Sequence, residues 1–356
     1  MRILTSAPGR ICLFGEHQDY FGFPVVASAI GLRGTIESEA RSDRRVHLDL
    51  LDLGTSREWD LDSLPEPGPR DYWLSALHVA KKEGWLPPVG WNARVTSQIP
   101  QQAGASSSSA LTAAWCALIA LRNGRVVDDE AGREWIAHAT WRSEVQWFNE
   151  PGGMMDQVMC AMGGTRKIEF TPKFQTTQLP KPEGVWTLID SHQPKETLSI
   201  LSSAKERRLE LISQWGVGLG EEWPDVFPAR PQDWNAAEHR LMDATIGIRE
   251  VSSRGGGLLT SQPRAIEGIG ELLTAHHHWL SHGLEVSTPK IDGLLEASIA
   301  AGAFGGKING SGGGGTSFVV SNDETVQAIH RTLTERDAEA IPVELGAPGI
   351  EVIRVS

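Results

Sequence analysis

The stretch PQQAGASSSSAL, Pro100–Leu111, joins a run with strand-like alternation, Trp91–Ile99, to a run with helical spacing, Ser106–Leu121. Small residues at such a strand-to-helix junction leave successive backbone N–H groups accessible, and the start of the helix adds positive potential. This combination predicts a loop that binds phosphate groups. A serine-capped helix after an ordinary turn is the alternative interpretation, because serine side chains also cap free amides.

Two other kinds of nucleotide-binding loop do not fit the chain. It holds no GxxxxGK[ST] sequence, so the serine-rich loop is not of Walker type. A second glycine cluster, GKINGSGGGGTSFVV at Gly306–Val320, contains a formal GxGxxG at Gly310, Gly312 and Gly315. It leads into a predicted strand and not a helix, so it is not a dinucleotide fingerprint. Its glycines indicate either close approach of the backbone to another segment or ligand, or a plain glycine hairpin.

A third segment, PGRICLFGEHQDYFG at Pro8–Gly22, concentrates polar side chains around a predicted strand and the turn that follows it. These side chains are Arg10, Glu16, His17, Asp19 and Tyr20. Carboxylates and an imidazole presented together supply the acceptors and donors that a ligand with several hydroxyl groups requires. An exposed polar turn is the alternative interpretation.

The rest of the chain alternates between strand-like and helical patterns. Short apolar or β-branched runs predict strands at Ile11–Phe14, Val25–Ile30, Gly34–Glu39, Val46–Leu51, Thr187–Ile189, Lys307–Asn309 and Thr316–Val320. Apolar residues at helical spacing predict helices at Tyr72–Lys82, from Asp128 to Trp147, and at Pro231–Val251, Arg264–His278 and Lys290–Ala301. A length of 356 residues favours two domains or lobes, which we divide at residues 1–185 and 186–356.

The composition argues against several classes of protein. A formal net charge of −12 without a cluster of Lys and Arg disfavours nucleic-acid binding. No run reaches about 18 consecutive apolar residues, and the first residues lack a secretion signal, so we expect no membrane association and a cytoplasmic location. The cysteines lack CxxC spacing and are expected to be reduced, buried thiols. They are Cys12, Cys116 and Cys160.

A histidine cluster invites interpretation as a metal site, because His278 and His282 lie one helical turn apart beside His276 and His277. We reject that interpretation. Consecutive helical residues point about 100° apart, and no acidic third ligand has suitable spacing. The sequence instead predicts a solvated helix surface.

Together, the segments at Pro8–Gly22, Gly104–Ser109 and Gly306–Val320 resemble the three signature motifs of the GHMP kinases, and the first is most similar to that of galactokinases. The resemblance implies an α+β fold of two lobes, an N-terminal lobe of ribosomal-protein S5-like type and a C-terminal α/β lobe. It also implies transfer of the γ-phosphoryl group of ATP, with Mg²⁺, to a monosaccharide hydroxyl, the anomeric 1-hydroxyl by analogy with galactokinases. We expect a monomer or a homodimer.

The resemblance also implies roles for individual residues. NEPGGMMDQVMCAMGG, Asn149–Gly164, is similar to the galactokinase segment with the catalytic aspartate, which Asp156 matches. Arg10 would stabilise negative charge on the transferred phosphoryl group and keep Asp156 ionised. Glu144 and Ser108 are the expected Mg²⁺ ligands, since a hard cation takes oxygen donors. Sugar binding is assigned to Glu16, His17, Asp19, Gly153 and Asp156, and ATP binding to Gly104, Ala105, Ser106, Ser107, Ser108, Gly310, Gly312 and Gly313.

The sequence departs from the galactokinase pattern in three places. After the strand that ends at Asp190, the tyrosine of a YNxRR-like segment is missing, and the residues from Ala204 to Arg208 stand there instead. Asn309 and Ser311 replace Thr and Ala or Gly, and Ser109 replaces Ala. The acceptor is therefore left open among another hexose, a uronic acid and a heptose derivative.

Two alternative functions also stay open. A mevalonate-type isoprenoid kinase of the same superfamily is disfavoured, because Arg10 replaces the Lys usual there and Asp19 adds a polar group suited to a polyol. A non-catalytic regulator that binds sugar and ATP is disfavoured because Arg10, Glu144 and Asp156 are all present.

Overall fold

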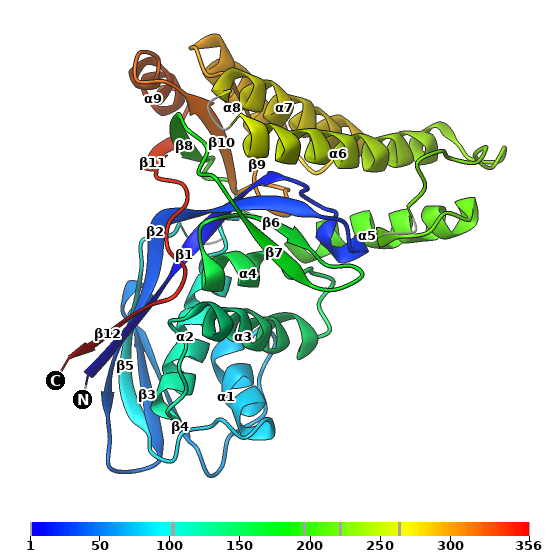
Figure 1. Ribbon diagram of the computed structural model, residues 1–356. Helices are drawn as coiled ribbons and strands as arrows, with labels where there is room; N and C mark the ends of the chain where they lie inside the picture. The colour runs from blue at the N-terminus through cyan, green and yellow to red at the C-terminus, as the bar shows by residue number, and fades with distance from the viewer. Residues whose placement is uncertain (1, 101–103, 195–196, 221–222, 263–264, 356) are drawn as a thin grey trace.

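The computed structural model describes residues 2–100, 104–194, 197–220, 223–262 and 265–355. In it, two β-sheets are each covered by helices (Figure 1). The strands of the first sheet are β1 (Arg2–Phe14), β2 (Val25–Ala40), β3 (Arg45–Leu50), β4 (Thr55–Asp60), β5 (Trp91–Ser97), β6 (Thr165–Glu169), β7 (Gln175–Leu179) and β12 (Glu351–Val355). Their order is β12–β1–β2–β5–β3–β4, with β6 beside β2 and β7 beside β6. The two ends of the chain thus lie side by side (Figure 1).

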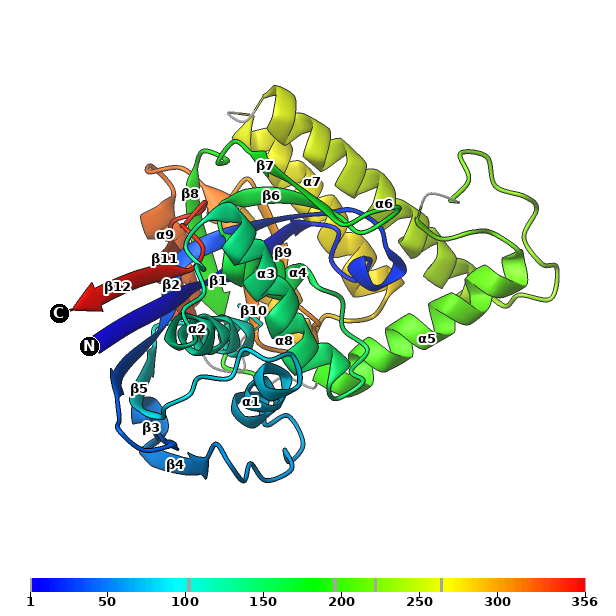
Figure 2. The ribbon, with the colours of Figure 1, turned by 60° about the horizontal axis from the view of Figure 1, so that its bottom comes forward.

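Helices cover one face of the first sheet. They are α1 (Tyr72–Lys82), α2 (Ser107–Arg122), α3 (Glu130–Trp141) and α4 (Met155–Met162), and α3 continues into a π-helical turn, Arg142–Gln146. Figure 2 shows α1, α2 and α3 grouped together on this side. Helix α2 packs on β1 and β2, and its Trp115 is fully buried against Trp91 of β5, with 5.5 Å between ring centroids. This core holds the serine-rich loop against the strand that carries Arg10.

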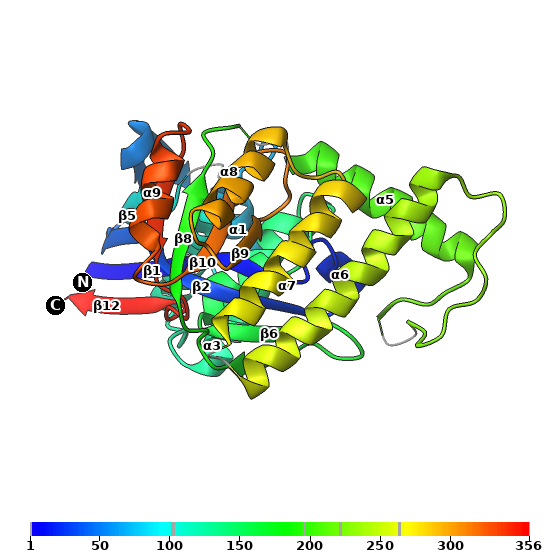
Figure 3. The ribbon, with the colours of Figure 1, turned by 90° about the horizontal axis from the view of Figure 1, so that it is seen from above.

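The second sheet is smaller and antiparallel. Its strands are β8 (Val185–Asp190), β9 (Gly305–Ile308), β10 (Thr316–Ser321) and β11 (Glu339–Val343), in the order β11–β8–β10–β9. The helices of this part are α5 (Thr197–Trp215), α6 (Ala236–Ser261), α7 (Ile266–His278), α8 (Pro289–Ala300) and α9 (Val326–Thr334). Viewed from above, α6, α7 and α8 run beside one another over this part, and α5 and α6 extend away from the sheets (Figure 3).

Local sequence explains where several helices begin. Asn235 and Glu238 form a capping box at the start of α6, and the Thr288 side chain caps α8 just before Pro289. Asp71 caps α1, whose bounds agree with the predicted helix Tyr72–Lys82. The predicted strands Val25–Ile30 and Gly34–Glu39 are one strand, because β2 pairs with β1 on both sides of a shift in register between Ala29 and Arg33.

Other predictions differ from the structure or are not tested by it. The helix predicted from Asp128 to Trp147 starts after the cap residue Asp129 and widens into the π-helical turn, which periodicity alone cannot signal. The division at residue 185 stays a prediction: β8 begins the second sheet, whereas β12 lies in the first. The three cysteines are buried and free, as predicted. Within the described ranges, no helix is long and apolar enough to span a membrane.

Candidate active site

A cavity of about 780 Å³ lies where β1 and its following turn, the serine-rich loop, the π-helical turn, α4 and the glycine cluster meet. Its size falls within the usual range for small-molecule sites. Most of the predicted site residues line it: Arg10, Glu16, His17, Asp19, Gly104, Ser106, Ser107, Ser108, Glu144, Gly153, Asp156 and Gly310. The fold therefore gathers residues from both sheets and from distant parts of the chain into one wall.

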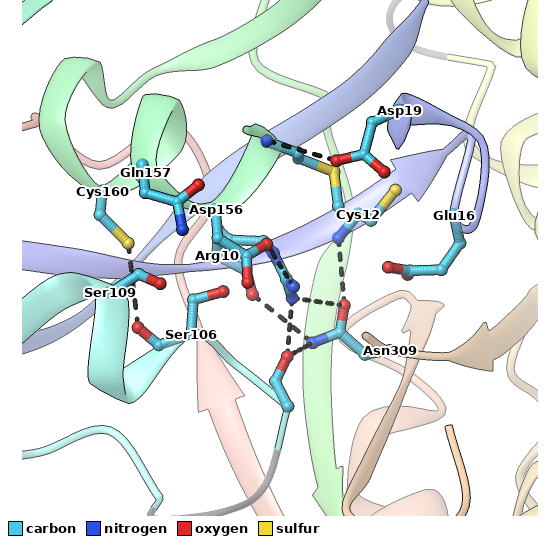
Figure 4. A network of polar contacts seen from close by, with 12 residues as sticks. Arg10, Cys12, Glu16, Asp19, Ser106, Ser109, Asp156, Gln157, Cys160 and Asn309 are labelled. Carbon is cyan, nitrogen blue, oxygen red and sulfur yellow. Dashed lines mark hydrogen bonds and ion pairs between the residues drawn. The ribbon is translucent and has the colours of Figure 1, made fainter. Parts of the chain in front are cut away.

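Arg10 and Asp156 form an ion pair in that wall (Figure 4). Arg10 Nε and Nη2 lie 2.8 Å and 2.6 Å from the same oxygen, Asp156 Oδ1. Burial alone would lower the pKa of Arg10, but the charges of Asp156 and Glu16 outweigh it and raise that pKa. The Arg10 side chain is 4% exposed and that of Asp156 is 34% exposed, so the carboxylate is the member of the pair that a ligand can reach.

The serine-rich loop is anchored to Arg10 by both backbone and side chain. Arg10 N donates to Ala105 O at 3.1 Å, and Arg10 Nη1 donates to Gly104 O at 2.7 Å. Ser106, the residue before α2, adopts a left-handed φ of 62° and makes no cap hydrogen bond with its side chain. Its buried hydroxyl finds no partner among the described residues. The serine-cap interpretation is thus wrong for Ser106, and the geometry favours a loop that meets a ligand.

Glu144, in the π-helical turn, is buried beside this loop. Its Oε2 accepts hydrogen bonds from Ser109 Oγ and Gln157 Nε2, both at 2.7 Å. Burial raises the pKa of Glu144 to about 7, although these two hydrogen bonds act in the opposite direction. By sequence, Ser109 is only a departure from the family pattern, yet it is the serine that contacts Glu144, whereas Ser108 is exposed toward the cavity.

One end of the cavity, here called the Asp19 end, is formed by His17, Asp19, Tyr20 and Gly153. Asp19 accepts hydrogen bonds from the backbone N–H groups of Tyr20 at 3.0 Å and Met155 at 3.4 Å. Gly153 is required there, because a Cβ atom on it would lie 1.8 Å from Asp19 Oδ2. Burial, and then the nearby charge of Asp156, raises the pKa of Asp19 to about 6.

A chain of hydrogen bonds orients His17 at this end. His17 Nε2 lies 3.0 Å from the carbonyl oxygen of Ser311, which can only accept, so Nε2 carries the proton. Nδ1 then accepts from the Tyr20 hydroxyl at 3.2 Å. Arg208 of α5 is fully buried and donates to that hydroxyl and to His17 O. The segment that lacks the expected tyrosine therefore contributes through Arg208.

Glu16 does not present a free carboxylate. Its Oε2 accepts from Lys307 Nζ at 2.8 Å, and Lys307 also donates to Cys12 O and Ile308 O. Burial opposes the charge of Glu16, but Lys307 and Arg10 outweigh burial and lower the pKa of Glu16. The side chains of Lys307 and Glu16 are 0% and 4% exposed, so this ion pair ties β9 of the second sheet to the turn after β1.

The glycine cluster and the histidine cluster differ in part from expectation. Gly310 lines the cavity, but Gly312 and Gly313 do not; Gly313 N donates to Val286 O at 2.8 Å, and a Cβ on Gly312 would lie 2.1 Å from that oxygen. The close-approach interpretation is therefore confirmed, with a protein segment as the neighbour.

The predicted solvated surface is wrong for two of the histidines. His276 is fully buried, and its ring lies parallel to that of Phe14 of β1, with 6.5 Å between centroids. His277 lies 3.0 Å from Asp292 and accepts from Ile308 N at 3.3 Å. Helix α7 packs on β9, and this packing buries the side of the helix that carries His276. The spacing of the histidines alone does not show which side of the helix faces solvent. No group of three or more potential metal ligands of the His, Cys, Asp and Glu types is found in the part of the chain that the structure describes.

The residues that support the site are not part of its predicted set. For Lys307 the sequence does hold a signal, because it is a charged residue in a short, otherwise uncharged strand. If such a residue is buried, it needs a partner of opposite charge. Gln157 and Ser109 give no such signal, because their contacts with Glu144 depend on how α2, α4 and the π-helical turn pack.

Three family models match the chain at these segments. The galactokinase galactose-binding signature matches residues 2–37, the GHMP kinases N terminal domain matches residues 71–164, and the GHMP kinases C terminal model matches residues 260–339. These models, the fold and the cavity define a phosphotransferase with ATP as cosubstrate. The chain belongs to the GHMP kinase family. The predicted family and fold class are thereby confirmed.

Individual relatives of the chain cover nearly its whole length. A mevalonate kinase of Thermococcus gammatolerans is 28% identical and spans 100% of this chain and 99% of that protein. A galactokinase of Thermococcus kodakarensis is 26% identical and spans 100% and 98%. The crystal structure of Lactococcus lactis galactokinase complexed with galactose shares the fold at a TM-score of 0.83, with 19% identity over 98% of this chain and 95% of that one. Sugar and mevalonate kinases are thus similar to this chain to the same degree.

Proposed function

We propose that this chain transfers the γ-phosphoryl group of ATP to a monosaccharide hydroxyl, the anomeric 1-hydroxyl. A bond forms between the acceptor oxygen and the γ-phosphorus, and the bond from that phosphorus to the β–γ bridging oxygen breaks. The hydroxyl proton passes to Asp156, and ADP and a sugar phosphate are the products. The match of the galactose-binding signature to residues 2–37 supports a sugar as acceptor.

The observation that carries this proposal is the carboxylate of Asp19. It lines the cavity, its two contacts are backbone N–H groups, and no ion pair of Asp19 occurs within the described ranges. A carboxylate without a cation accepts hydrogen bonds from hydroxyl groups and repels another carboxylate. Both ring nitrogens of His17 and the Tyr20 hydroxyl are engaged with other groups of the protein, so Asp19 is the acceptor that this end offers to a neutral polyol.

Arg10 and Asp156 are assigned to the chemical step. Asp156 is accessible from the cavity and would accept the proton of the attacking hydroxyl or orient its oxygen. Arg10 stays charged and uses two nitrogens on one oxygen of Asp156, which holds that carboxylate in a fixed orientation. Its guanidinium also lies against Gly104 of the serine-rich loop, where it would stabilise charge on the transferred phosphoryl group.

The loop from Gly104 to Ser108 is assigned to the phosphates of ATP, and Glu144 and Ser108 to Mg²⁺. The surroundings of Glu144 fit a hard cation. Its Oε1 is buried without a hydrogen-bond partner among the described residues, whereas Oε2 is held by two donors. An oxygen in this state suits a cation, and Ser108 lines the same cavity. Bound Mg²⁺ would neutralise charge on the β- and γ-phosphates.

Mevalonate is the second candidate acceptor, and one observation favours it. Mevalonate kinases at 25% and 28% identity match 97% and 100% of the chain. A mevalonate carboxylate would however need a cation, and among the described residues the Arg and Lys side chains that line the cavity are engaged, Arg10 by Asp156 and Arg70 by Glu150. The charges of the Asp19 end therefore favour the sugar.

The proposed function is tested with a panel of acceptors. The purified chain with Mg²⁺ and ATP is given neutral hexoses, heptoses, uronic acids and mevalonate, and release of ADP is followed. We expect turnover with a neutral sugar and a product phosphorylated at the 1-hydroxyl by ³¹P NMR. Turnover with mevalonate alone would replace the proposal by the second candidate. Sugar binding in calorimetry without turnover of any acceptor would indicate a regulator.

Asp19→Asn is expected to remove a pH-dependent destabilisation of the fold and to weaken acceptor binding. The pKa of Asp19 is about 6 in the folded chain, above its ordinary value of 3.8, so the fold holds this proton more tightly than the unfolded chain does. Ionised Asp19 therefore destabilises the wild type above pH 6, by about 1 to 3 kcal/mol, and this effect disappears below pH 3.8. The amide can accept only one of the two backbone N–H groups, which changes the stability of the variant by the same amount at every pH, so the prediction concerns the change between the two pH values. Urea denaturation at pH 4 and pH 8 measures it.

The same variant loses the charged acceptor, so KM for the sugar should rise about tenfold or more, as for a hydrogen bond to a charged group, while KM for ATP stays unchanged. Asp233→Asn is the matched control, because Asp233 is exposed. An unchanged KM for the sugar would remove Asp19 from the acceptor site.

A further inference from the structure

Asn309 directly follows β9 and is fully buried where the second sheet meets β1 and the serine-rich loop. Figure 4 shows its side chain between the loop and Arg10, next to the ion pair with Asp156. None of the roles proposed above involves the Asn309 side chain. Its surroundings nevertheless consist of segments that supply the proposed chemistry.

The Asn309 amide makes four polar contacts. Its Oδ1 accepts from Cys12 N at 3.1 Å and from Arg10 Nη1 at 3.4 Å. Its Nδ2 donates to Gly104 O at 3.1 Å and to Arg10 O at 3.5 Å. A carboxamide offers two acceptor sites and two N–H donors, so this side chain is fully used. Both the backbone and the side chain of Arg10 are contacted.

This pattern selects an amide over other side chains. An aspartate could accept from Cys12 and Arg10 but could not donate to the two carbonyl groups, and its charge would compete with Asp156 for Arg10. A threonine has a single hydroxyl hydrogen, so it can serve one carbonyl group only. An apolar side chain would leave Cys12 N buried without its partner. Of these side chains, only an amide can make all four contacts.

The contacts also determine which way Arg10 faces. Nη1 is held between Gly104 O, at 2.7 Å, and Asn309 Oδ1. Because the guanidinium is planar and rigid, fixing Nη1 turns Nε and Nη2 toward Asp156. Asn309 itself is placed by β9, whose Ile308 N donates to His277 of α7. The orientation of Arg10 thus depends on the second sheet.

We propose that Asn309 is a positioning residue that sets the orientation of Arg10 relative to Asp156 and the serine-rich loop. The inference rests on the proposed function in that phosphoryl transfer is the reaction that this orientation serves. The effect of Asn309 on the reaction passes through Arg10, and it is expected to vanish when Arg10 can no longer make the forked contact.

A double-mutant cycle tests the dependence on Arg10. Asn309→Ala is expected to lower kcat by about 10- to 100-fold, the range for loss of a residue that orients a reacting group. In an Arg10→Lys background, the same substitution should lower kcat by less than about threefold, because effects that pass through one residue do not multiply. Equal losses in both backgrounds would overturn the proposal.

The orientation of Arg10 can also be observed without any acceptor. In the full chain labelled with ¹⁵N-arginine, the Nε–H resonance of Arg10, assigned by its loss in Arg10→Lys, reports the hydrogen bond to Asp156. Asn309→Ala should shift this resonance and speed its exchange with solvent. This result would support the proposal even if no acceptor in the panel were turned over, so the two proposals can fail separately.

Two further variants complete the design. Ser317→Ala is the matched control: Ser317 is fully buried in β10, pairs with Ile308, and its hydroxyl has no hydrogen-bond partner among the described residues. It should leave kcat and the Arg10 resonance unchanged. Asn309→Thr, which keeps one donor and an acceptor, should give intermediate values and serves if Asn309→Ala does not fold. An Arg10 resonance and a kcat equal to those of the wild type in both Asn309 variants would contradict the proposal.

Discussion

Asp156→Asn is expected to lower the turnover number by about 100- to 10,000-fold, the range that loss of a positioned general base produces. Asparagine keeps the size of the side chain and an oxygen that can accept from Arg10 Nε, but it cannot take a proton from the acceptor. The affinity for ATP should change little, because the proposed phosphate contacts come from Gly104 to Ser108. Single-turnover assays and titration with a fluorescent ATP analogue measure the two quantities separately.

The fold must be shown to survive in this variant. Arg10 is buried, so it needs an acceptor in place of the lost charge, and asparagine provides one where alanine does not. Asp233→Asn, an amide substitution at an exposed aspartate, controls for handling of the purified protein. Turnover within about tenfold of the wild type, well below the loss for a general base, would rule out Asp156 as the group that accepts the proton.

Lys307→Met is expected to lower the free energy of unfolding by about 3 to 5 kcal/mol, the effect of removing one partner of a buried ion pair. Lys307 is 0% exposed, and its loss would leave the Glu16 carboxylate, at 4% exposure, without its ion-pair partner. The carbonyl groups of Cys12 and Ile308 would also lose a donor. Urea denaturation at pH 7 measures the change.

Two comparisons separate this effect from the loss of any lysine. Lys181→Met removes an ion pair of similar length, 2.7 Å to Glu344, at a side chain that is 51% exposed, and should leave stability nearly unchanged. Adding Glu16→Gln to Lys307→Met should restore part of the stability, because the buried charge is gone. If Lys307→Met were as stable as Lys181→Met, the ion pair could not be what joins the turn after β1 to β9.

Much of the fold could be predicted from local patterns. Tyr72–Lys82 has helical spacing and a capping aspartate before it, and α1 has those bounds. The strand, loop and helix around Gly104 follow from alternation, small residues and spacing in a single stretch of sequence. The C-terminal strand β12 was not predicted, because its five residues alternate weakly between polar and apolar types and its pairing partner, β1, lies at the other end of the chain.

The candidate site, like the fold, could be predicted only in part from local sequence. Recognisable motifs contain Arg10, Asp19, Asp156 and the serine-rich loop, and the fold places these residues around one cavity. The residues that hold them were not predicted as such. Ser109 and not Ser108 contacts Glu144, because the packing of α2 against the π-helical turn directs that serine inward. His276 was expected in solvent, but α7 lies over β9 and buries it.

Local sequence alone specified the serine-rich loop, its helix and most of the polar groups that line the cavity, because glycine and other small residues act over a few positions. Only the tertiary structure decided how those groups are held. Lys307 neutralises Glu16 across 291 residues of sequence, and Asn309 reaches Cys12 across 297. Such contacts arise from sheet pairing and helix packing, which bring together segments that no local pattern relates. The physical reason is that burying a charge or an amide imposes a demand for a partner without specifying which distant residue supplies it.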